Sequence, residues 1–433
     1  MKPRNHQPIQ LLFSFLFFFC SVFLATAQDL YLQCGEIFDA GSGKFLQERT
    51  LVVSGNKITK VLSGFSSGSA KDSVIDLRQK TVLPGFIDLH VHIESESSPT
   101  RYLERFTQND VDVAFESTIY AKRTLMAGFT TVRDLGGSGV NIALRKAVDK
   151  GLVVGPRIFT AGKAIATTGG HADPTNGVRW DAMGDPGPKE GVVNSPEDAK
   201  KAVRQRYKDG ADVIKVTATG GVMSVAKNGQ NPQFTTEELK AIVATAKDYG
   251  MLTAAHAHGD EGMRRAILAG INTIEHGTLM EEPTMDLMIE HNTFLVPTIS
   301  AGKAAAAMAD IPGFLPSVVA QKAREIGPIS ERNFKKAYEK GVPIAFGTDA
   351  GVSPHGENGR EFTFMHEAGM PVVAALQSAM TTNAKLLGME NALGALREGY
   401  FADIVAVDEN PVKNVRTLEK VTFVMKNGTV YKN

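Results

Sequence analysis

The chain has 433 residues, of which 43% are hydrophobic and 22% are charged, and its 47 basic residues balance its 47 acidic residues. This is ordinary globular composition, long enough for one large core and a smaller module, and a single barrel domain of this size would be normal. The neutral balance gives no electrostatic reason to expect nucleic acid or an anionic membrane as a partner.

The first 27 residues have the pattern of a secretory signal peptide. Lys2 and Arg4 give a positive start, an apolar run follows over 11–24, and residues 25–27 (Ala-Thr-Ala) form the small-x-small pattern of a cleavage site. The alternative is an uncleaved membrane anchor, but the run would span only about 21 Å as a helix, against a hydrocarbon core of about 30 Å. We therefore predict a signal peptide over 1–27 and a secreted or periplasmic protein without membrane contact after cleavage.

Cleavage would leave 45 basic and 47 acidic residues and one of the two cysteines. Cys20 lies in the predicted signal peptide, so Cys34 is the only thiol of the mature chain. The mature chain therefore cannot form an internal disulfide, and its core must stabilise it without covalent cross-links.

Both ends of the mature chain contain short strand patterns. These are predicted at residues 51–53, 57–61, 403–407, 421–425 and 429–431. The first two form a hairpin around a Ser-Gly-Asn turn, and the last two form another around an Asn-Gly turn. We predict one small β-sandwich domain built from residues 28–80 together with 391–433.

The middle of the chain, residues 81–390, alternates short apolar strands with helical patterns. The predicted strands are Gly85–His90, Thr130–Asp134, Arg157–Ala161, Val213–Thr217, Leu252–His256, Asn272–Glu275, Thr293–Val296 and Ile344–Thr348. Helical patterns such as Thr236–Tyr249, which Thr235 or Thr236 can cap, lie between most of them. This alternation predicts the α/β class and a closed (β/α)8 TIM-type barrel, and an open doubly wound sheet is the alternative.

A long loop is predicted from Ala166 to Ser195, after the third strand of this region. It is rich in Gly, Pro and Asp. Loops of this length in compact domains are often functional, so this one is a candidate lid.

Histidines end three of the predicted strands. His90 and His92 lie two residues apart at an extended strand end, so their side chains face the same side. His256 and His258 repeat this spacing, and His276 ends the next strand. Neutral imidazoles on one face can chelate a divalent ion, although a single pair is more often coincidental and a single buried histidine more often structural.

A lysine and an aspartate occupy two further strand ends. Lys215 lies inside the strand 213–217, where burial of an ammonium group is costly and lowers its pKa. A neutral amine can react with carbon dioxide to give a carbamate that bridges two ions; the alternative is a lysine that reaches the barrel mouth or pairs with an acid. Asp349 follows the last predicted strand, and its alternative role is a helix N-cap.

These residue types gather where the strands of a barrel converge. Five of the ten histidines lie at three strand ends, and the carboxyl ends of barrel strands surround one opening. Structural roles give no reason for that concentration, so the sequence predicts a metal site. Arg133 and Asp134, after the second strand, are interpreted as a salt bridge that supports it.

With these residues in this order, the chain resembles the amidohydrolase superfamily. The pattern of that superfamily is His-x-His after strand one, Lys after strand four, His after strands five and six, and Asp after strand eight. Segments 131–137, 169–171, 256–258, 274–277 and 399–405 are most similar to the branch of imidazolonepropionase-like enzymes and Xaa-Pro dipeptidases. The resemblance spans nearly the whole mature chain.

The resemblance implies two divalent metal ions, expected to be zinc. The implied ligands are His90, His92 and Asp349 for one ion, His256 and His276 for the other, and carboxylated Lys215 for both. His171 and His258 would face the substrate. Asp349 would take the proton of the attacking water and pass it to the leaving amine, and His171 would help to stabilise the oxyanion.

The leading hypothesis is an exported amidohydrolase that cleaves a dipeptide or N-acyl amino acid near its C-terminal carboxylate. Alternatives are a hydrolase of cyclic amides, lactones or aryl amides, an imidazolonepropionase-like enzyme or deaminase, and a non-catalytic metal-binding exported protein. Imidazolonepropionase uses one metal and lacks the strand-four lysine, so Lys215 argues against that activity. The expected partner is a small-molecule or dipeptide substrate, and the sequence leaves a homo-oligomer open.

Overall fold

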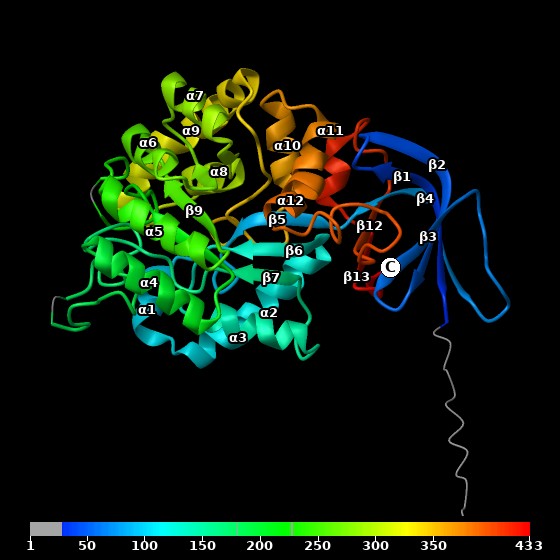
Figure 1. Cartoon of the computed structure of the whole chain (residues 1–433), viewed down its shortest axis with the longest axis horizontal. Coiled ribbons are helices and arrows are strands. Elements are labelled where there is room, and N and C mark those ends of the chain that lie inside the picture. Colours follow the sequence, from blue (N-terminus) through cyan, green and yellow to red (C-terminus); the bar gives the residue numbers. More distant parts are fainter. Residues whose placement is uncertain (1–27, 180, 227) are drawn as a thin grey trace, which may run out of the picture.

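The structure is a computed structural model, and it describes residues 28–179, 181–226 and 228–433. The predicted signal peptide, residues 1–27, lies outside the described residues. Among the helices of the described chain, none combines the length and the apolar character needed to cross a bilayer. Figure 1 shows a sheet built from both ends of the chain beside a larger part in which strands alternate with helices.

Both ends of the chain contribute to one seven-stranded sheet, at the right of Figure 1. Its strands, in spatial order, are β14 (Thr429–Lys432), β13 (Phe423–Lys426), β12 (Ile404–Val407), β4 (Ser73–Pro84), β1 (Leu30–Asp39), β2 (Lys44–Ser54) and β3 (Lys57–Ser63). Neighbouring strands are antiparallel, except that β1 and β4 are parallel. The two predicted hairpins are confirmed as β2–β3 and β13–β14.

The sheet curls so that β3 approaches the segment before β12. The Ile58 N–H donates to Tyr400 O at 3.0 Å, and the Gly399 N–H donates to Ile58 O at 2.8 Å. Apolar side chains from both chain ends, such as Leu32 and Ile404, share one buried core. The predicted sandwich is therefore a single curled sheet, because backbone ladders join the strands of both termini, and the predicted domain limits stay a prediction.

Seven parallel strands form two sheets in the larger part. One contains β5 (Phe86–Val91), β6 (Phe129–Asp134) and β7 (Arg157–Thr160), and the other contains β8 (Val213–Thr217), β9 (Leu252–Ala257), β10 (Thr273–His276) and β11 (Phe294–Val296). Each strand begins and ends within one residue of its predicted bounds. Apolar periodicity therefore locates these strands well.

Short backbone contacts join the edges of these two sheets. The N–H of Ile165, after β7, donates to Lys215 O of β8 at 2.8 Å. The Ala345 N–H donates to Leu295 O of β11 at 2.9 Å, and the Asp349 N–H donates to His90 O of β5 at 2.7 Å. Residues 344–350 thus lie between β11 and β5, where the eighth strand is expected.

The eighth predicted strand, Ile344–Thr348, is not a regular strand. Its segment makes only isolated bridges, at Ile344 and Ala350. Side-chain acceptors interrupt the backbone ladder here, since Asn383 Oδ1 accepts from Phe346 N at 3.2 Å and Asp88 Oδ1 accepts from Thr348 N at 3.1 Å. The apolar pattern correctly indicates burial, but remote acceptors satisfy the backbone donors here.

Helices surround the parallel strands at the left of Figure 1. They are α1 (Arg101–Thr107), α2 (Asp110–Met126), α3 (Val140–Asp149), α4 (Pro196–Asp209), α5 (Thr236–Asp248), α6 (Asp260–Leu268), α7 (Glu282–His291), α8 (Ile299–Ala309), α9 (Ser317–Lys340), α10 (Arg360–Glu367), α11 (Val372–Gln377) and α12 (Asn383–Leu386). Thr235 caps α5 in a capping box with Glu238, which confirms the predicted start of that helix.

Hydrogen bonds from basic side chains connect the curled sheet to the parallel strands. Arg157 of β7 donates to Asp403 Oδ2 at 2.7 Å and to Asn427 Oδ1 at 2.6 Å. Lys426 of β13 donates to Gly155 O at 2.6 Å, and burial lowers the pKa of its amine to about 8. These bonds hold the C-terminal end of the chain against the strand region that carries the site.

Candidate active site

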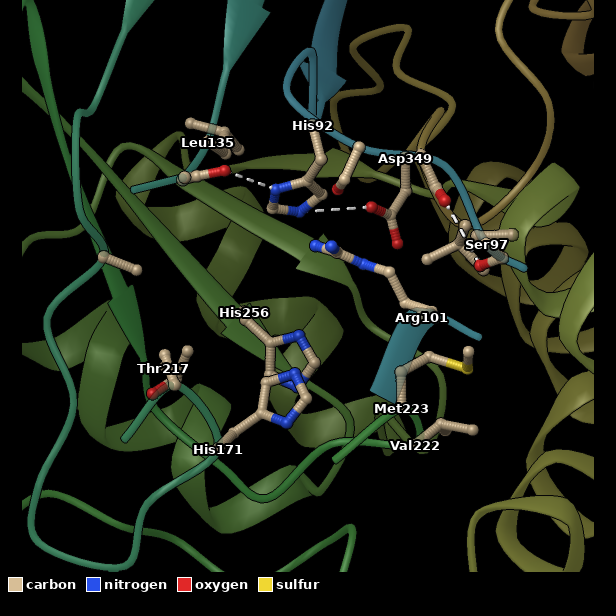
Figure 2. Close-up of a pocket in the computed structure, with 18 of the residues that line it drawn as sticks. His92, Ser97, Arg101, Leu135, His171, Thr217, Val222, Met223, His256 and Asp349 are labelled. Atoms are coloured by element: carbon tan, nitrogen blue, oxygen red, sulfur yellow. Dashed lines mark hydrogen bonds and ion pairs between the residues drawn. The ribbon is translucent and has the colours of Figure 1, made fainter. Parts of the chain in front are cut away.

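Residues at the carboxyl ends of the parallel strands line one cavity of about 840 Å³. Its floor comes from β5, β8, β9, β10 and segment 344–350, and its rim from α1, the loop 166–195, the loop after β8, and helices α8 and α9. Figure 2 shows His92 and Asp349 on one side of the cavity, with His171 and His256 on the other. Ligands of parallel α/β architectures bind at this end of the strands.

His90, His92 and Asp349 form the first ligand group, in which the candidate donor atoms lie within 4.8 Å of one another. Asp349 Oδ1 lies 3.5 Å from His90 Nε2 and 3.3 Å from His92 Nε2. Two donors bound to a tetrahedral zinc ion at about 2.0–2.1 Å are separated by about 3.4 Å. The spacing of this group therefore suits one shared ion.

Two acceptors hold these imidazoles in place. His90 Nδ1 lies 2.9 Å from Glu275 Oε2, and His92 Nδ1 lies 2.8 Å from Gly136 O. Both contacts use the second ring nitrogen and leave Nε2 toward Asp349. Contacts of this kind fix the tautomer and the ring orientation of metal-binding histidines.

Arg133 fixes Glu275 in turn. Its guanidinium donates to Glu275 Oε1 at 2.9 Å and to Leu89 O at 2.6 Å, and both charged side chains are buried. The salt bridge predicted for Arg133 is therefore made with Glu275 and not with Asp134, because adjacent residues of a strand face opposite sides. Asp134 instead accepts a hydrogen bond from Thr160 Oγ1 at 2.7 Å.

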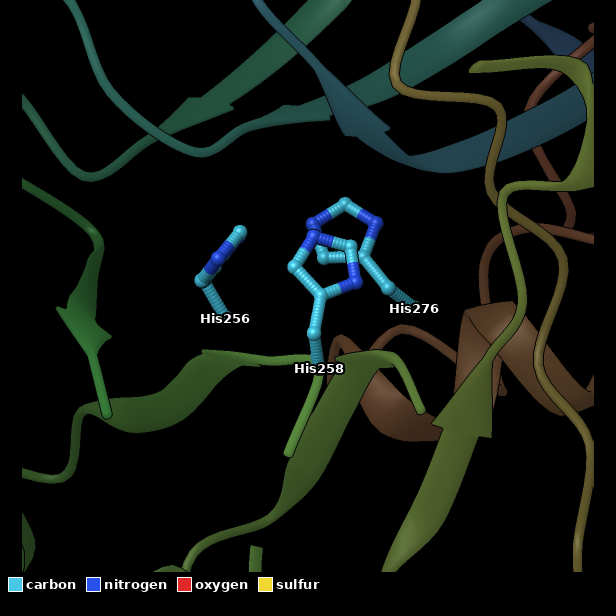
Figure 3. Close-up of side chains that lie close together, drawn as sticks. All are labelled: His256, His258 and His276. Carbon is cyan, nitrogen blue, oxygen red and sulfur yellow. The ribbon is translucent and has the colours of Figure 1, made fainter. Parts of the chain in front are cut away.

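His256, His258 and His276 form the second ligand group, drawn in Figure 3, and their candidate donor atoms also lie within 4.8 Å of one another. His276 Nδ1 lies 2.7 Å from Thr298 Oγ1, and His258 Nδ1 lies 2.9 Å from Thr278 Oγ1. These hydroxyl groups orient the rings as the acceptors of the first group do.

His171, from the loop 166–195, lies against the second ligand group. Its ring stacks on that of His256 with centroids 4.3 Å apart, and its backbone N–H donates to Gln233 Oε1 at 2.8 Å. His256 Nε2 lies 3.1 Å from Gly220 O, which leaves Nδ1 as the nitrogen for an ion. His171 Nδ1 is buried without a hydrogen-bond partner in the described chain. The candidate lid therefore brings an unsatisfied polar atom to the cavity.

Three non-glycine residues at the cavity have left-handed backbone conformations. The φ angles are 74° at His276, 48° at Thr298 and 57° at Asp349. Such conformations cost about 1–3 kcal/mol each and persist where the surroundings determine them, which is often at functional sites. The backbone thus places two candidate ligands and the hydroxyl partner of one of them at an energetic cost.

Burial keeps the histidines of the cavity neutral. It lowers the pKa of His92 to about 4 and the pKa of His258 to about 3. It also lowers the pKa of His171 to about 3 and holds the pKa values of His90, His256 and His276 well below the ordinary value. The neutral imidazole is the form that binds metal ions.

Lys215 enters the same cavity from β8 and is only 4% exposed. Burial lowers the pKa of its amine to about 8, and the carboxylates of Glu275 and Asp349 oppose that change. Part of the amine is therefore neutral in weakly basic solution, which is the reactive form.

The donor set fits a divalent ion. Asp349 Oδ1 is buried and has no hydrogen-bond partner within the described residues, and burial raises the pKa of this carboxyl to about 8 while Lys215 opposes the rise. Leaving such an atom unsatisfied costs about 1–3 kcal/mol, which an ion among these donors would relieve. Imidazole nitrogen and carboxylate oxygen are ligands that zinc accepts.

The sequence profile of the amidohydrolase family matches residues 81–432, which covers the parallel strands, the helices and the end of the curled sheet. The chain belongs to the amidohydrolase family. It is therefore a hydrolase that acts on amide bonds. The resemblance to the amidohydrolase superfamily that its motifs indicated is confirmed.

Curated and solved relatives match this amidohydrolase over most of their length. Ochratoxinase of Aspergillus niger is 32% identical over 422 residues, covering 90% of this chain and 84% of the fungal enzyme. A crystal structure of a Xaa-Pro dipeptidase with bound methionine in the active site is 50% identical, with a TM-score of 0.91, and covers 94% of this chain and 100% of that one. A prolidase complexed with N-methylphosphonate-L-proline is 32% identical, with a TM-score of 0.86 and the same coverages.

The structure places all eight predicted site residues around the same cavity. They are His90, His92, His171, Lys215, His256, His258, His276 and Asp349. Their roles as ligands or substrate contacts stay predictions. His258, predicted to face the substrate, lies in the second ligand group with two predicted ligands.

Two buried glutamates support the site although the sequence assigns them no role. Glu275 directly precedes a candidate ligand inside an apolar strand, and that position is a usable signal. Glu361 of α10 accepts hydrogen bonds from Ile299 N at 2.8 Å and Ser300 N at 2.7 Å, which fixes the start of α8 beside Thr298. Nothing in the sequence connects this helix with the site, because the contact exists only after folding.

Proposed function

We propose that this chain is an exported, binuclear metal-dependent amidohydrolase that hydrolyses an amide bond in a dipeptide or an N-acyl amino acid. The observation that carries the proposal is the pair of ligand groups facing one cavity that Lys215 also enters. Two separate groups provide donors for two ions, and a carboxylated lysine would supply the bridge between them.

In this proposal the first ligand group would hold one zinc ion, His256 and His276 would hold the other, and carboxylated Lys215 would contact both. When bound, such ions lower the pKa of water and polarise a carbonyl oxygen. Asp349 accepts the proton of the water, then gives it to the leaving amine. His171, with its unsatisfied Nδ1, stabilises the oxyanion.

Two expectations about architecture and location belong to the same proposal. We interpret the ring of parallel strands and segment 344–350 as a (β/α)8 barrel, supported by the hydrogen bonds that join its sheets. We infer that residues 1–27 direct export and are removed. Sequencing of the mature N-terminus should then read from Gln28, and an intact Met1 on exported protein would contradict cleavage.

Similarity to a Xaa-Pro dipeptidase and a prolidase supports a dipeptide substrate. Similarity to ochratoxinase of Aspergillus niger supports a second candidate, a hydrolase of an ochratoxin-like substrate. Both candidates use the same proton transfers, so they differ only in what the rim of the cavity accepts.

A substrate panel tests the proposal. The purified protein is loaded with zinc in bicarbonate buffer and assayed with Xaa-Pro and other dipeptides, N-acyl amino acids, a cyclic amide and a lactone. We expect free amino acid from dipeptides or N-acyl amino acids, and loss of turnover after chelation. Hydrolysis of the lactone alone, or of no substrate, would overturn the proposal.

A further inference from the structure

Arg101, the first residue of α1, lines the rim of the cavity. Figure 2 shows its guanidinium directed toward His92 and Asp349 of the first ligand group. The guanidinium therefore faces the floor of the cavity.

The charge of Arg101 is weakly compensated. Its closest acidic partner in the described chain is Glu104, with 3.8 Å between Nη1 and Oε2, which is beyond hydrogen-bond distance. Glu104 Oε1 accepts instead from Ser98 Oγ at 2.9 Å and from Thr100 Oγ1 at 2.7 Å. The side chain of Arg101 is 44% exposed, so a guanidinium is available at the rim.

Arg105, one turn further along α1, gives a contrast. It also lines the cavity, but its guanidinium donates to Pro174 O at 2.6 Å and to Asn176 O at 2.9 Å. These bonds tie α1 to the candidate lid. Of the two arginines, Arg105 has a structural partner and Arg101 has an open donor face.

An apolar wall stands beside Arg101. Val222 and Met223, both drawn in Figure 2, line the cavity together with Leu315 and Ile326. These side chains pack in one cluster with the start of α9. The Tyr102 hydroxyl donates to Met223 O at 2.6 Å and so fixes α1 against this wall.

We propose that Arg101 binds the substrate carboxylate and that the apolar wall accepts the bulky apolar side chain of the same amino acid. This inference rests on the proposed amide hydrolysis. The carboxylate carbon of an N-acyl amino acid lies roughly 3–4 Å from the scissile carbonyl carbon. A cationic side chain that binds the carboxylate must therefore lie close to the groups that bind the carbonyl. Arginine can donate two parallel hydrogen bonds to a carboxylate. Arg101 is thus a specificity-determining residue.

The test compares two substrates that differ only in the carboxylate, N-acetyl-L-phenylalanine and N-acetylphenethylamine. Arg101→Gln should lower kcat/KM for the first about 10- to 100-fold, mainly through KM, and change it for the second less than about 2-fold. Arg101→Lys should recover part of the loss, and Arg360→Gln, which removes an exposed arginine outside the cavity, should behave as wild type. Equal losses for both substrates, or none for either, would overturn the assignment.

A binding measurement separates this inference from the proposed function. Calorimetry compares 3-phenylpropanoate with the uncharged 3-phenylpropan-1-ol on the zinc-loaded wild type and on Arg101→Gln. If the wild type prefers 3-phenylpropanoate and Arg101→Gln loses that preference, the assignment of Arg101 is supported, even if neither amide is hydrolysed. Absence of hydrolysis would contradict the proposed function alone. Equal affinity of the two proteins for 3-phenylpropanoate contradicts Arg101 whatever the amides do.

Discussion

At the floor of the cavity each histidine of the two ligand groups has a partner for its second ring nitrogen, whereas the rim is built differently. At the rim, His171 Nδ1 has no partner in the described chain, and the side chain of Arg101 is 44% exposed. The floor consists of strand ends and segment 344–350, and the rim consists of loops and of helices α1, α8 and α9.

This difference matches two separate requirements of an enzyme. Donors for ions and protons must be held in place before the substrate arrives, which the buried contacts of the floor achieve. Groups that recognise a substrate gain from being on loops and helix ends, where they are exposed and variable. Changes at the floor should therefore affect chemistry, and changes at the rim should affect binding.

The largest effect is expected at the floor, from Asp349→Asn. The amide can no longer accept the proton, so kcat should fall about 10²- to 10⁴-fold while zinc content at saturation stays near that of the wild type. Steady-state kinetics and elemental analysis measure both quantities. Near-normal turnover would show that Asp349 does not transfer the proton. It would also contradict the expectation that changes at the floor affect chemistry.

The second prediction concerns the contact that orients His90. Glu275→Gln leaves the buried Arg133 without its counter-charge, so the free energy of unfolding should fall by about 3–5 kcal/mol. Zinc affinity should also fall about 10- to 100-fold, because the imidazole loses its orienting carboxylate. Urea denaturation and competition with a chelator check these values.

Asp403→Asn is the matched control for Glu275→Gln. It breaks another arginine–carboxylate pair, that of Arg157, at the junction with the curled sheet. It should reduce stability and leave zinc affinity unchanged. Equal zinc affinities for the two variants would show that Glu275 serves the fold alone.

The third prediction uses pH. Burial raises the pKa of Glu361 from 4.5 to about 7, so the folded state binds more protons than the unfolded state between these values. The contribution of this raised pKa to the free energy of unfolding, about 3 kcal/mol in all, is fully present below pH 4.5. It is lost as the pH rises through 7. The difference in unfolding free energy between metal-free wild type and Glu361→Gln should shrink by that amount over this window. Glu357→Gln, at an exposed position, should show no such trend. If Glu361→Gln also shows no pH-dependent difference from the wild type, the raised pKa of Glu361 is refuted.

The smallest effect is expected at the rim, from Lys322→Met. Lys322 of α9 donates to Gly221 O and Ser224 O at 2.7 Å and to Ala226 O at 2.8 Å, and so holds the loop that carries Val222. Loss of these bonds should raise KM about 10-fold with kcat within about 2-fold of wild type. Lys335→Met, on an exposed face of the same helix, is the control. A fall in kcat with unchanged KM would mean that the rim takes part in the chemistry.

The floor could be predicted from the sequence because ligand types mark strand ends. Seven strands begin and end within one residue of their predicted bounds, and the eight candidate residues line one cavity. The eighth strand was predicted wrongly because Asp88 and Asn383 supply side-chain acceptors from distant segments. The partner of Arg133 was also wrong, because Glu275 is adjacent only across the folded strands.

The rim could not be predicted in the same way. The position of Arg101 depends on the orientation of α1. A hydrogen bond from the Tyr102 hydroxyl to the backbone oxygen of Met223 fixes that orientation. Contacts of this kind join loops that have no periodic pattern. Loop conformation therefore carries the substrate preference, and composition reports only that a loop is present.

The number of metal ions per chain tests the central claim most directly. The purified protein is saturated with zinc in bicarbonate buffer, desalted and analysed for metal, beside Lys215→Met as the variant without a bridging group. The account predicts two ions per wild-type chain and at most one per variant chain. One ion or none in the wild type, or two in both proteins, would contradict a pair of ions bridged by Lys215.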